Sequence, residues 1–336
     1  MRLEDVCIKG TSNIRQKDVN ESGRYPVYGA AGPVGFMNSF QYDEPYVGVV
    51  KDGAGIGRAT YLPSNSSIIG TIQALIPKNN VLPKYLYYAV SSMHLEKYYS
   101  GATIPHIYFK NYKHERFVLV SKKEQEQIIW RFSLLEKMIS NKQQQLLKLN
   151  ELIKARFVEM FGDPVNNSKD QPVDKFINIV KLQRGFDLPV KKRDSTGKIP
   201  VFGSNGIVGY HTEAKAKNGI ITGRSETIGK VYRKSGEYWP LNTSLFSVDT
   251  HGNNIIFLQV LMQLFHLERF YNGAGVPTLN RNDVHRQKII KISLDKQNEF
   301  ANFVQQVDKS KFENIVYLNK TLSRKILSQI GDVIRD

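Results

Sequence analysis

The sequence predicts an α+β protein with two pseudo-symmetric mixed α/β domains, separated by two long helices that pack as an antiparallel coiled coil. Three observations support this fold class. The sequence repeats itself once, and each half contains strand-like segments separated by Gly and Pro. Each half also continues into a long polar segment from which Gly and Pro are absent.

The repeat joins the two halves at a nearly constant spacing. Residues 25–36 (YPVYGAAGPVGF) return as residues 199–210 (IPVFGSNGIVGY), 174 positions later. Ile56-Gly57 and Ile228-Gly229 match at an offset of 172. A period this long indicates a duplicated domain rather than a solenoid. Such a duplication can fold with approximate two-fold symmetry, which suits a nearly symmetric partner such as duplex DNA.

Within each half, short apolar segments are bounded by Gly and Pro, and one segment has apolar residues at helical spacing. In the first half, the predicted strands are 46–50, 53–57, 59–62 and 68–76, and the predicted helix is 84–99. In the second half, the predicted strands are 219–223, 229–232 and 244–248, and the predicted helix is about 254–270. Each half is therefore expected to form a mixed domain.

The long polar segment of the first half begins at Lys122, after which Glu, Gln, Lys and Leu dominate until Gly162. Apolar residues follow at alternating steps of three and four from Ile128 to Met160, a pattern typical of a coiled-coil stripe. The 37 residues from Glu124 to Met160 would span about 55 Å as a helix. This is much longer than a helix that only closes a small domain.

A second stripe runs from about 295 to 335, and a lysine interrupts each stripe, Lys142 in the first and Lys311 in the second. Because so long an apolar stripe needs a partner, we expect the two helices to pack on each other. They should be antiparallel, since a whole domain separates them. The predicted organisation is a first domain at 1–121, a central helix at 122–163, a second domain at 164–293 and a C-terminal helix at 294–336.

The composition narrows the class of protein. Hydrophobic content of 41% and charged content of 23% are typical of soluble globular domains. No apolar run approaches the roughly 18 residues that span a bilayer, and the first ten residues lack a signal-peptide core. The single cysteine, Cys7, cannot form an intramolecular disulfide. We therefore expect a cytoplasmic protein with no membrane partner.

The net charge is strongly positive. Lys and Arg outnumber Asp and Glu by 47 to 31, which gives a formal charge of +16. An excess of this size predicts a polyanionic partner. A second interpretation stays open, that the charge only keeps the protein soluble.

Three segments resemble catalytic motifs, and none fits. Residues 223–230 have five residues between their glycines where a phosphate-binding loop needs four. Residues 52–57 lack the spacing of a dinucleotide fingerprint and are better explained as a hairpin. Residues 43–46 lack the second proline of the element with which adenine methyltransferases hold their target. The seven histidines are scattered, so no metal site is predicted. We therefore expect no catalysis by this chain alone.

Basic and hydrogen-bonding side chains in the loops are the candidates for DNA contact, because Arg and Lys bind phosphate or guanine and Asn suits adenine. Lys51 and Arg58 flank the glycine-rich loop of the first half, and Arg224 and Lys230 flank its counterpart. Solvated loop charges are the competing interpretation for each residue. The full set is Lys51, Arg58, His106, Lys110, Lys113, Arg184, Lys192, Arg224, Lys230, Asn280 and Arg281.

These features together resemble the specificity subunit of type I restriction-modification systems. Near its start, each half has a Pro-x-aromatic-Gly-x-x-Gly-x-x-Gly element, and it continues to a Gly-x-x-x-Pro element. Residues 122–128 (KKEQEQI) are similar to the Glu-Gln entry of that family's long helix. The resemblance covers the whole chain.

The resemblance implies a protein without its own catalysis. Each half would be a target-recognition domain for one part of a split, asymmetric site in double-stranded DNA, and the helices would set the gap between the two parts. The helices would also dock two methyltransferase subunits, which bind S-adenosylmethionine, so this chain would bind no cofactor. A restriction-translocase subunit is a further partner that the resemblance allows. The predicted docking residues are Gln125, Ile128, Phe132, Leu135, Gln297, Phe300 and Val304.

Two other functions remain open from the residues. The chain could be a standalone or degenerate nucleic-acid-modifying enzyme, which would be active without partners. It could also be a structural protein that assembles through its coiled coil, in which case the loop cations would be dispensable. If the chain is instead a specificity subunit, substitution of Arg58 should impair recognition of one half-site, and substitution of Arg224 should impair recognition of the other.

Overall fold

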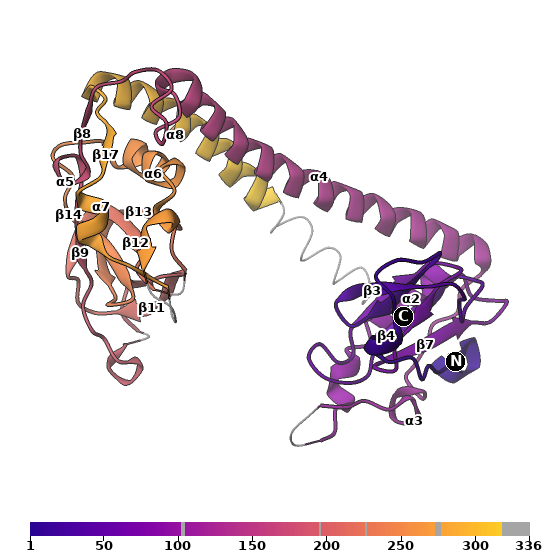
Figure 1. Ribbon diagram of the computed structural model, residues 1–336. Helices are drawn as coiled ribbons and strands as arrows, with labels where there is room; N and C mark the ends of the chain where they lie inside the picture. The colour runs from indigo at the N-terminus through magenta and orange to yellow at the C-terminus, as the bar shows by residue number, and fades with distance from the viewer. Residues whose placement is uncertain (102–104, 195, 226, 273–276, 318–336) are drawn as a thin grey trace. The chain divides into compact units, whose positions relative to one another are not determined.

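The computed structural model describes residues 1–336 except 102–104, 195, 226, 273–276 and 318–336. The chain divides into two compact units (Figure 1). One contains residues 1–143 with the described residues from Ile315 onward, and the other contains residues 144–314. Below, domain 1 denotes residues 1–121 and domain 2 denotes residues 164–293, and each is considered within its own unit.

Domain 1 is a mixed α/β domain with two small sheets. A four-stranded antiparallel sheet has the order β1-β7-β4-β5, and a three-stranded sheet has the order β3-β2-β6. Every residue of the central strand β4 is buried, as its continuous apolar sequence predicts. The elements are α1 (Leu3–Val6), β1 (Cys7–Gly10), η1 (Gln16–Asp18), β2 (Tyr25–Gly29), β3 (Gly32–Met37), β4 (Tyr46–Val50), β5 (Ala59–Leu62), β6 (Ser67–Ile68), β7 (Ile72–Pro77), α2 (Pro83–Ser91), η2 (Leu95–Tyr98) and α3 (Phe109–Tyr112).

Domain 2 repeats this order of elements, with β13 in place of β5 and β6 and with the short strands β8, β15, β16 and β17 added. Its main sheet has six strands in the order β11-β10-β13-β12-β14-β9. Trp239, at the end of β13, lies in a small buried cluster with Leu188, Val201 and Leu241. The elements are β8 (Val173–Lys175), α5 (Phe176–Ile179), β9 (Lys181–Arg184), η3 (Val190–Lys192), β10 (Ile199–Gly203), β11 (Gly206–His211), β12 (Ala216–Gly223), β13 (Val231–Pro240), β14 (Ser244–Asp249), α6 (Ile255–Leu264), η4 (Leu267–Phe270), β15 (Tyr271–Asn272), β16 (Thr278–Leu279), α7 (Arg281–His285) and β17 (Lys288–Ile290).

The two long helices are present. Helix α4 (Lys122–Phe161) has 40 residues, about 60 Å, and is followed by Gly162 at the predicted cap position with φ +82°. Helix α8 (Leu294–Tyr317) is described as far as Tyr317, and the rest of the predicted C-terminal helix lies outside the described residues.

The helices pack antiparallel where both belong to the second unit. The rings of Phe157 and Phe300 lie 5.4 Å apart, and Arg156 pairs with Glu299 at 3.7 Å. In the first unit, which holds the start of α4 and the described end of α8, the ammonium of Lys142 lies 5.4 Å from the ring centre of Tyr317. The earlier residue of α4, Lys142, meets the later residue of α8, Tyr317, whereas Phe157 meets Phe300. This order confirms the predicted antiparallel pair. Lys142 and Lys311 interrupt the apolar stripes but keep partners, since Lys311 pairs with Asp308 at 3.1 Å.

The two shorter predicted helices are interrupted at equivalent histidines. Residues 84–99 divide into α2 and η2 at His94, and residues 254–270 divide into α6 and η4 at His266. Both histidines have left-handed backbone angles, φ +52° and +55°, which end an α-helix. The prediction of one continuous helix in each domain was therefore wrong.

Two predicted strands also differ from the structure. Residues 53–57 form turns in the loop between β4 and β5, where Gly53, Gly55 and Gly57 all have positive φ. Residues 68–76 divide between β6 and β7, which belong to different sheets. Apolar content alone does not distinguish the glycine-rich segment 53–57, or the turn at 69–71, from a strand.

A buried glutamine attaches each long helix to its own domain. In domain 1 the Gln125 amide accepts a hydrogen bond from the backbone N–H of Leu82 at 2.8 Å and donates to the carbonyl groups of Asn80 and Val120. The bonds to Leu82 and Asn80 satisfy backbone groups at the start of α2, and the bond to Val120 satisfies one just before α4. Gln297 accepts from the Asn254 N–H at 2.9 Å and donates to Asn253 Oδ1 and the Ile292 carbonyl. The same side chain therefore performs the same connection in both copies.

Candidate nucleic-acid interface

The loops that follow the central strands place one cation at the same position in each domain. Val49 pairs with Ala59 in domain 1, and Thr222 pairs with Val231 in domain 2, so Lys51 and Arg224 are equivalent by strand register. The Lys51 carbonyl accepts a hydrogen bond from Ile107 N at 2.8 Å, and the Arg224 carbonyl accepts one from Leu279 N at 2.7 Å. Both side chains are half-buried.

The next residue of each loop forms an isolated antiparallel bridge to the segment before the short helix α3 or α7. Asp52 bridges His106 in domain 1, and Ser225 bridges Thr278 in domain 2. In domain 1 the side chains also meet, with His106 Nδ1 2.6 Å from Asp52 Oδ1. The backbone geometry is thus shared between the domains, whereas the side chains on it differ.

Four of the predicted residues of domain 2 surround one hollow of about 410 Å³. Arg184 comes from the end of β9, Arg224 from the loop after β12, and Asn280 and Arg281 from the start of α7. Leu245, Thr278 and Leu279 complete its lining. Three guanidinium groups and an amide around one depression can bind phosphate oxygens or the hydrogen-bonding edges of bases.

In domain 1 the equivalent segment carries aromatic side chains. The ring of Tyr108, half of which is exposed, stacks at 6.3 Å on His106. The ammonium of Lys110 lies 5.4 Å from the centre of the Tyr108 ring. His106 and Lys110 are therefore connected through Tyr108, and Asp52 holds His106. Asp52 and Tyr108 were absent from the predicted set.

Arg58 and Lys230 form the second matched pair. Each follows a glycine with positive φ, Gly57 or Gly229, and each reaches the turn of the glycine-rich hairpin of its own domain. Arg58 donates to the Ala30 carbonyl, and Lys230 Nζ lies 3.5 Å from Asn205 Oδ1. Strand register therefore matches Arg58 with Lys230, as it matches Lys51 with Arg224.

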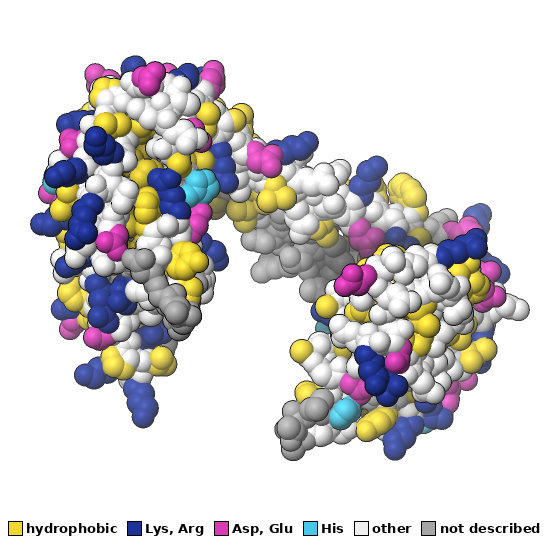
Figure 2. Space-filling model, in the orientation of Figure 1, with side chains coloured by type: hydrophobic (Ala, Val, Ile, Leu, Met, Phe, Trp, Pro, Cys, Tyr) yellow, Lys and Arg dark blue, Asp and Glu magenta, His cyan; other side chains and the backbone are white. Residues whose placement is uncertain are grey.

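The two remaining residues of the predicted set lie apart from these clusters. Lys113 pairs with Glu4 at 2.8 Å, and this contact lowers the pKa of the Glu4 carboxyl. Lys192 is exposed at the end of η3 and lies outside the 410 Å³ hollow. Figure 2 shows Lys and Arg side chains distributed over the visible face of domain 2, so basic character there is broader than the hollow.

Comparison with known proteins identifies the fold of both halves. The family model described as the type I restriction modification DNA specificity domain matches residues 1–151 and 175–324. The chain belongs to this specificity family. A search of curated proteins found no match.

Two solved structures match these specificity domains over nearly their whole length. The S subunit of a type I restriction-modification system from M. genitalium has 16% identity and a TM-score of 0.60, covering all of this chain and 96% of that one. A chain from a study of complex assembly and conformational transition of the type I R-M system has 11% identity and a TM-score of 0.57, covering 98% and 96%. At these identities, the likeness shows the fold.

The seven side chains that we expected to contact a partner are instead packed inside the specificity domains and helix pair. Gln125 and Gln297 make the helix attachments described above. Six of the seven are at least nine-tenths buried, and Leu135 packs against the core of domain 1. The regular spacing of these residues along the helices is therefore explained by packing within the chain. Any docking surface on these helices must consist of other side chains. The buried set is Gln125, Ile128, Phe132, Gln297, Phe300 and Val304.

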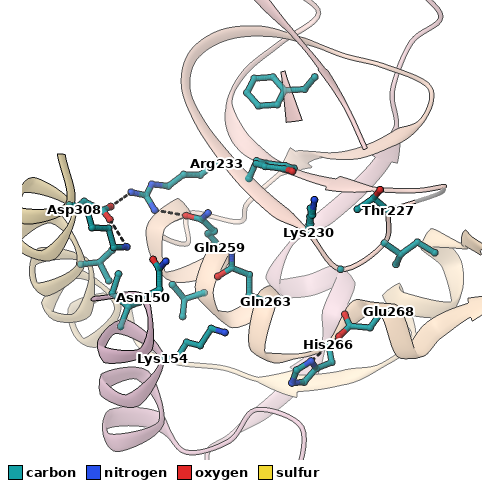
Figure 3. Close-up of a pocket in the computed structure, with 18 residues that line it drawn as sticks. Asn150, Lys154, Thr227, Lys230, Arg233, Gln259, Gln263, His266, Glu268 and Asp308 are labelled. Atoms are coloured by element: carbon teal, nitrogen blue, oxygen red, sulfur yellow. Dashed lines mark hydrogen bonds and ion pairs between the residues drawn. The ribbon is translucent and has the colours of Figure 1, made fainter. Parts of the chain in front are cut away.

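A second hollow, of about 890 Å³, lies where domain 2 meets α4 and α8 (Figure 3). Arg233 of β13 binds the Asp308 carboxylate of α8 and the Gln259 amide of α6, and Asp308 also accepts from Lys311 at 3.1 Å. Lys154 and His266 line the same hollow. The pair between Arg233 of β13 and Asp308 of α8 joins the domain to its helix at this hollow.

The described part of the chain has neither a cluster suited to a metal ion nor a helix suited to a membrane. No group of three or more His, Cys, Asp or Glu side chains there could hold a metal ion. No helix within the same residues combines the length and apolar character needed to cross a bilayer.

Proposed function

We propose that this chain determines the DNA sequence at which a type I restriction-modification complex acts. Domain 1 recognises one part of a bipartite site in double-stranded DNA and domain 2 recognises the other. The site is asymmetric, because the two domains present different side chains. The observation that carries the proposal is the shared backbone frame with His106 and Tyr108 on one copy and Thr278 and Asn280 on the other.

The proposed role of the helices is to separate the two domains and to bind two methyltransferase subunits. Helix α4 supports this role with a side-chain pair one turn apart, Trp130 and Leu134, which are 66% and 44% exposed. An exposed tryptophan on a soluble helix is a common centre of protein–protein interfaces. Trp130 and Leu134 therefore replace the buried stripe residues as the proposed contact points on α4.

The proposed chemistry resides in the partners. The methyltransferase subunits supply S-adenosylmethionine and transfer its methyl group to adenine, and this chain contributes recognition without a cofactor or a catalytic group. A restriction-translocase subunit joins the same complex in the cytoplasm. The absence of a recognisable catalytic motif in the sequence agrees with this division of labour.

The test is to purify the full chain alone and with its methyltransferase subunits, and to map methylated adenines on genomic DNA. The complex should methylate adenines within one split, asymmetric sequence, and the chain alone should methylate none. Methyl transfer by the isolated chain would favour the alternative of a standalone nucleic-acid-modifying enzyme. Methylation of a continuous palindrome would contradict the assignment of one half-site to each domain.

The docking surface is tested separately. Trp130→Ala with Leu134→Ala should weaken assembly with the methyltransferase by at least about tenfold while the chain stays folded, because hot-spot aromatic residues dominate interface energies. Lys148→Ala, also exposed on α4, is the matched control. Size-exclusion chromatography with light scattering measures the assembly. Unchanged assembly of the double variant would remove Trp130 and Leu134 from the interface.

A further inference from the structure

The two domains differ in a way that separates residues for phosphate contact from residues for base recognition. Both domains must bind the same sugar-phosphate backbone, whereas each must recognise different bases if the site is asymmetric. Positions that keep one chemistry in both copies therefore suit the backbone. Positions that share a backbone location but change chemistry suit the bases.

Lys51 and Arg224 satisfy the first condition. They occupy the same register position at the end of the buried central strand, and the same carbonyl-to-amide hydrogen bond fixes each loop. The positive charge is retained although the loop is one residue shorter in domain 2. A cation on such a fixed backbone position suits a phosphate, which needs charge more than a particular side-chain shape.

The segments facing these cations satisfy the second condition. The bridge residue is His106 in domain 1 and Thr278 in domain 2, at the same place in the fold. Two residues later, at the start of the short helix, Tyr108 in domain 1 corresponds to Asn280 in domain 2. Both of these later side chains are exposed.

The chemistry of each set is suited to hydrogen bonding with base edges. In domain 1, Asp52 holds His106 at 2.6 Å and the His106 ring stacks on Tyr108, so an imidazole and a phenol are presented in a fixed arrangement. In domain 2, Asn280 Oδ1 accepts a hydrogen bond from Asn282 N at 3.0 Å. This bond uses the side-chain oxygen of Asn280 and does not involve the two hydrogens of its side-chain NH₂ group. Arg281, where domain 1 has Phe109, adds a guanidinium to the same hollow.

We propose that Lys51 and Arg224 are matched phosphate contacts, and that His106 and Tyr108 in domain 1 and Asn280 and Arg281 in domain 2 determine which bases each domain accepts. This assignment rests on the proposed DNA-recognition function. Domain 2 should favour a half-site with guanine or adenine at the contacted positions, because Arg pairs with guanine and Asn with adenine in the major groove.

The experiment exchanges side chains between the domains in the full complex with the methyltransferase. One variant exchanges the cations, Lys51→Arg with Arg224→Lys, and another exchanges the variable residues, Tyr108→Asn with Asn280→Tyr. The complexes methylate a DNA library with randomised positions in both half-sites, and sequencing gives the preferred bases. The cation exchange should leave the preferred sequence unchanged, whereas the second exchange should alter preference in both half-sites by about tenfold or more.

Alanine variants supply the complementary measurement. Lys51→Ala and Arg224→Ala should weaken binding to all sequences alike and reduce the slope of log affinity against log salt by about 1 each. Arg281→Ala should instead relax preference at one position. Lys217→Ala is the matched control, since this exposed lysine lies at the opposite end of β12 from Arg224.

Three results would overturn the assignment. A changed sequence preference after the cation exchange would make Lys51 or Arg224 a base contact. An unchanged preference after the Tyr108 and Asn280 exchange, in a complex that still methylates DNA, would remove these residues from base recognition. If the wild-type complex showed no sequence preference at all, the proposed function would fail and this assignment with it.

Discussion

Domain 1 and domain 2 share their order of elements but differ in the continuity of one strand. In domain 1, β5 and β6 are separated by a turn and belong to different sheets, whereas in domain 2 the equivalent residues form the single strand β13. Pro63 cannot donate to a ladder, and Asn65 has φ +53°, so the strand ends there. In domain 2, Gly236 with φ +84° and Asn218 carry the strand past this point as an irregularity.

The attachment of each domain to its long helix shows what the duplication has preserved. In domain 2, Arg233 of β13 binds Asp308 of α8. In domain 1 the residue equivalent to Asp308 is Glu136 of α4, which pairs at 3.3 Å with Lys84 of α2 instead. An acidic residue on the helix is kept, although its partner comes from a different element. The domain–helix joint is therefore retained more strictly than the side chains that build it.

The largest expected effect concerns the helix pair in the second unit. Phe157 is fully buried, and its ring lies 5.0–5.5 Å from those of Phe161, Phe257 and Phe300. Phe157→Ala should lower the free energy of unfolding by about 4 kcal/mol, because it leaves a cavity shared by α4, α6 and α8. Urea denaturation measures the loss. A loss below about 1 kcal/mol would show that domain 2 does not depend on the helices.

The glutamine attachments should be equally important in both copies. Gln125→Leu and Gln297→Leu each leave at least two buried or partly buried backbone groups without their hydrogen bonds, so each should cost about 3 kcal/mol. Replacement by Glu is a matched variant that keeps an acceptor but removes the donors. Urea denaturation with domain-resolved hydrogen exchange measures each case. A strong effect in one domain alone would contradict their equivalence.

The ionic joints should differ between the domains. Arg233→Ala should cost about 2 kcal/mol, because Arg233 makes charge-assisted hydrogen bonds to two groups, whereas Lys84→Ala should cost about 0.5 kcal/mol as a more exposed pair. Double-mutant cycles with Asp308→Ala and Glu136→Ala isolate the pairwise energies. Equal coupling energies would indicate that exposure does not set the strength of these joints.

The smallest expected effect is a pH dependence confined to domain 2. His285 is buried, and its Nε2 accepts a hydrogen bond from Leu182 N at 2.9 Å. Its pKa is lowered mainly by burial and further by the positive charges of Arg281 and Lys181. Its protonation therefore favours the unfolded state, so domain 2 should lose stability as the pH falls below the ordinary histidine pKa of about 6.5. Domain 1 has Lys113 at this position. Hydrogen exchange, corrected for intrinsic rates, should show selective weakening of α6 at pH 5.5, and His285→Gln should abolish it.

Much of the architecture follows from the sequence because it is encoded over long stretches. The 174-residue repeat predicts two copies of one domain, and the absence of Gly and Pro after Lys122 predicts the long helix α4, which begins at that residue. The break at His94 could not be anticipated, because the apolar spacing continues through it and a left-handed histidine has no distinctive sequence signal.

The candidate site was predictable in composition but not in grouping. The sequence identifies Arg224 and Arg281 as candidate DNA contacts because they are loop cations. It does not show that the fold brings them to one hollow with Arg184. For the apolar stripe of the long helices, the sequence predicts the grouping of residues but not their role. Its periodicity identifies buried residues such as Phe300 without revealing whether the surface that covers them is a partner or the chain's own core.

The placement of the two tryptophans gives the chain two optical reporters. Trp130 is 66% exposed on α4, and Trp239 is 6% exposed in domain 2. The emission of an indole shifts to longer wavelength when water reaches it, so the two signals differ in colour. Coverage of α4 by another protein would shift the first towards the blue, whereas loss of the domain 2 core would shift the second towards the red. Fluorescence of the unmodified chain can therefore distinguish assembly from unfolding.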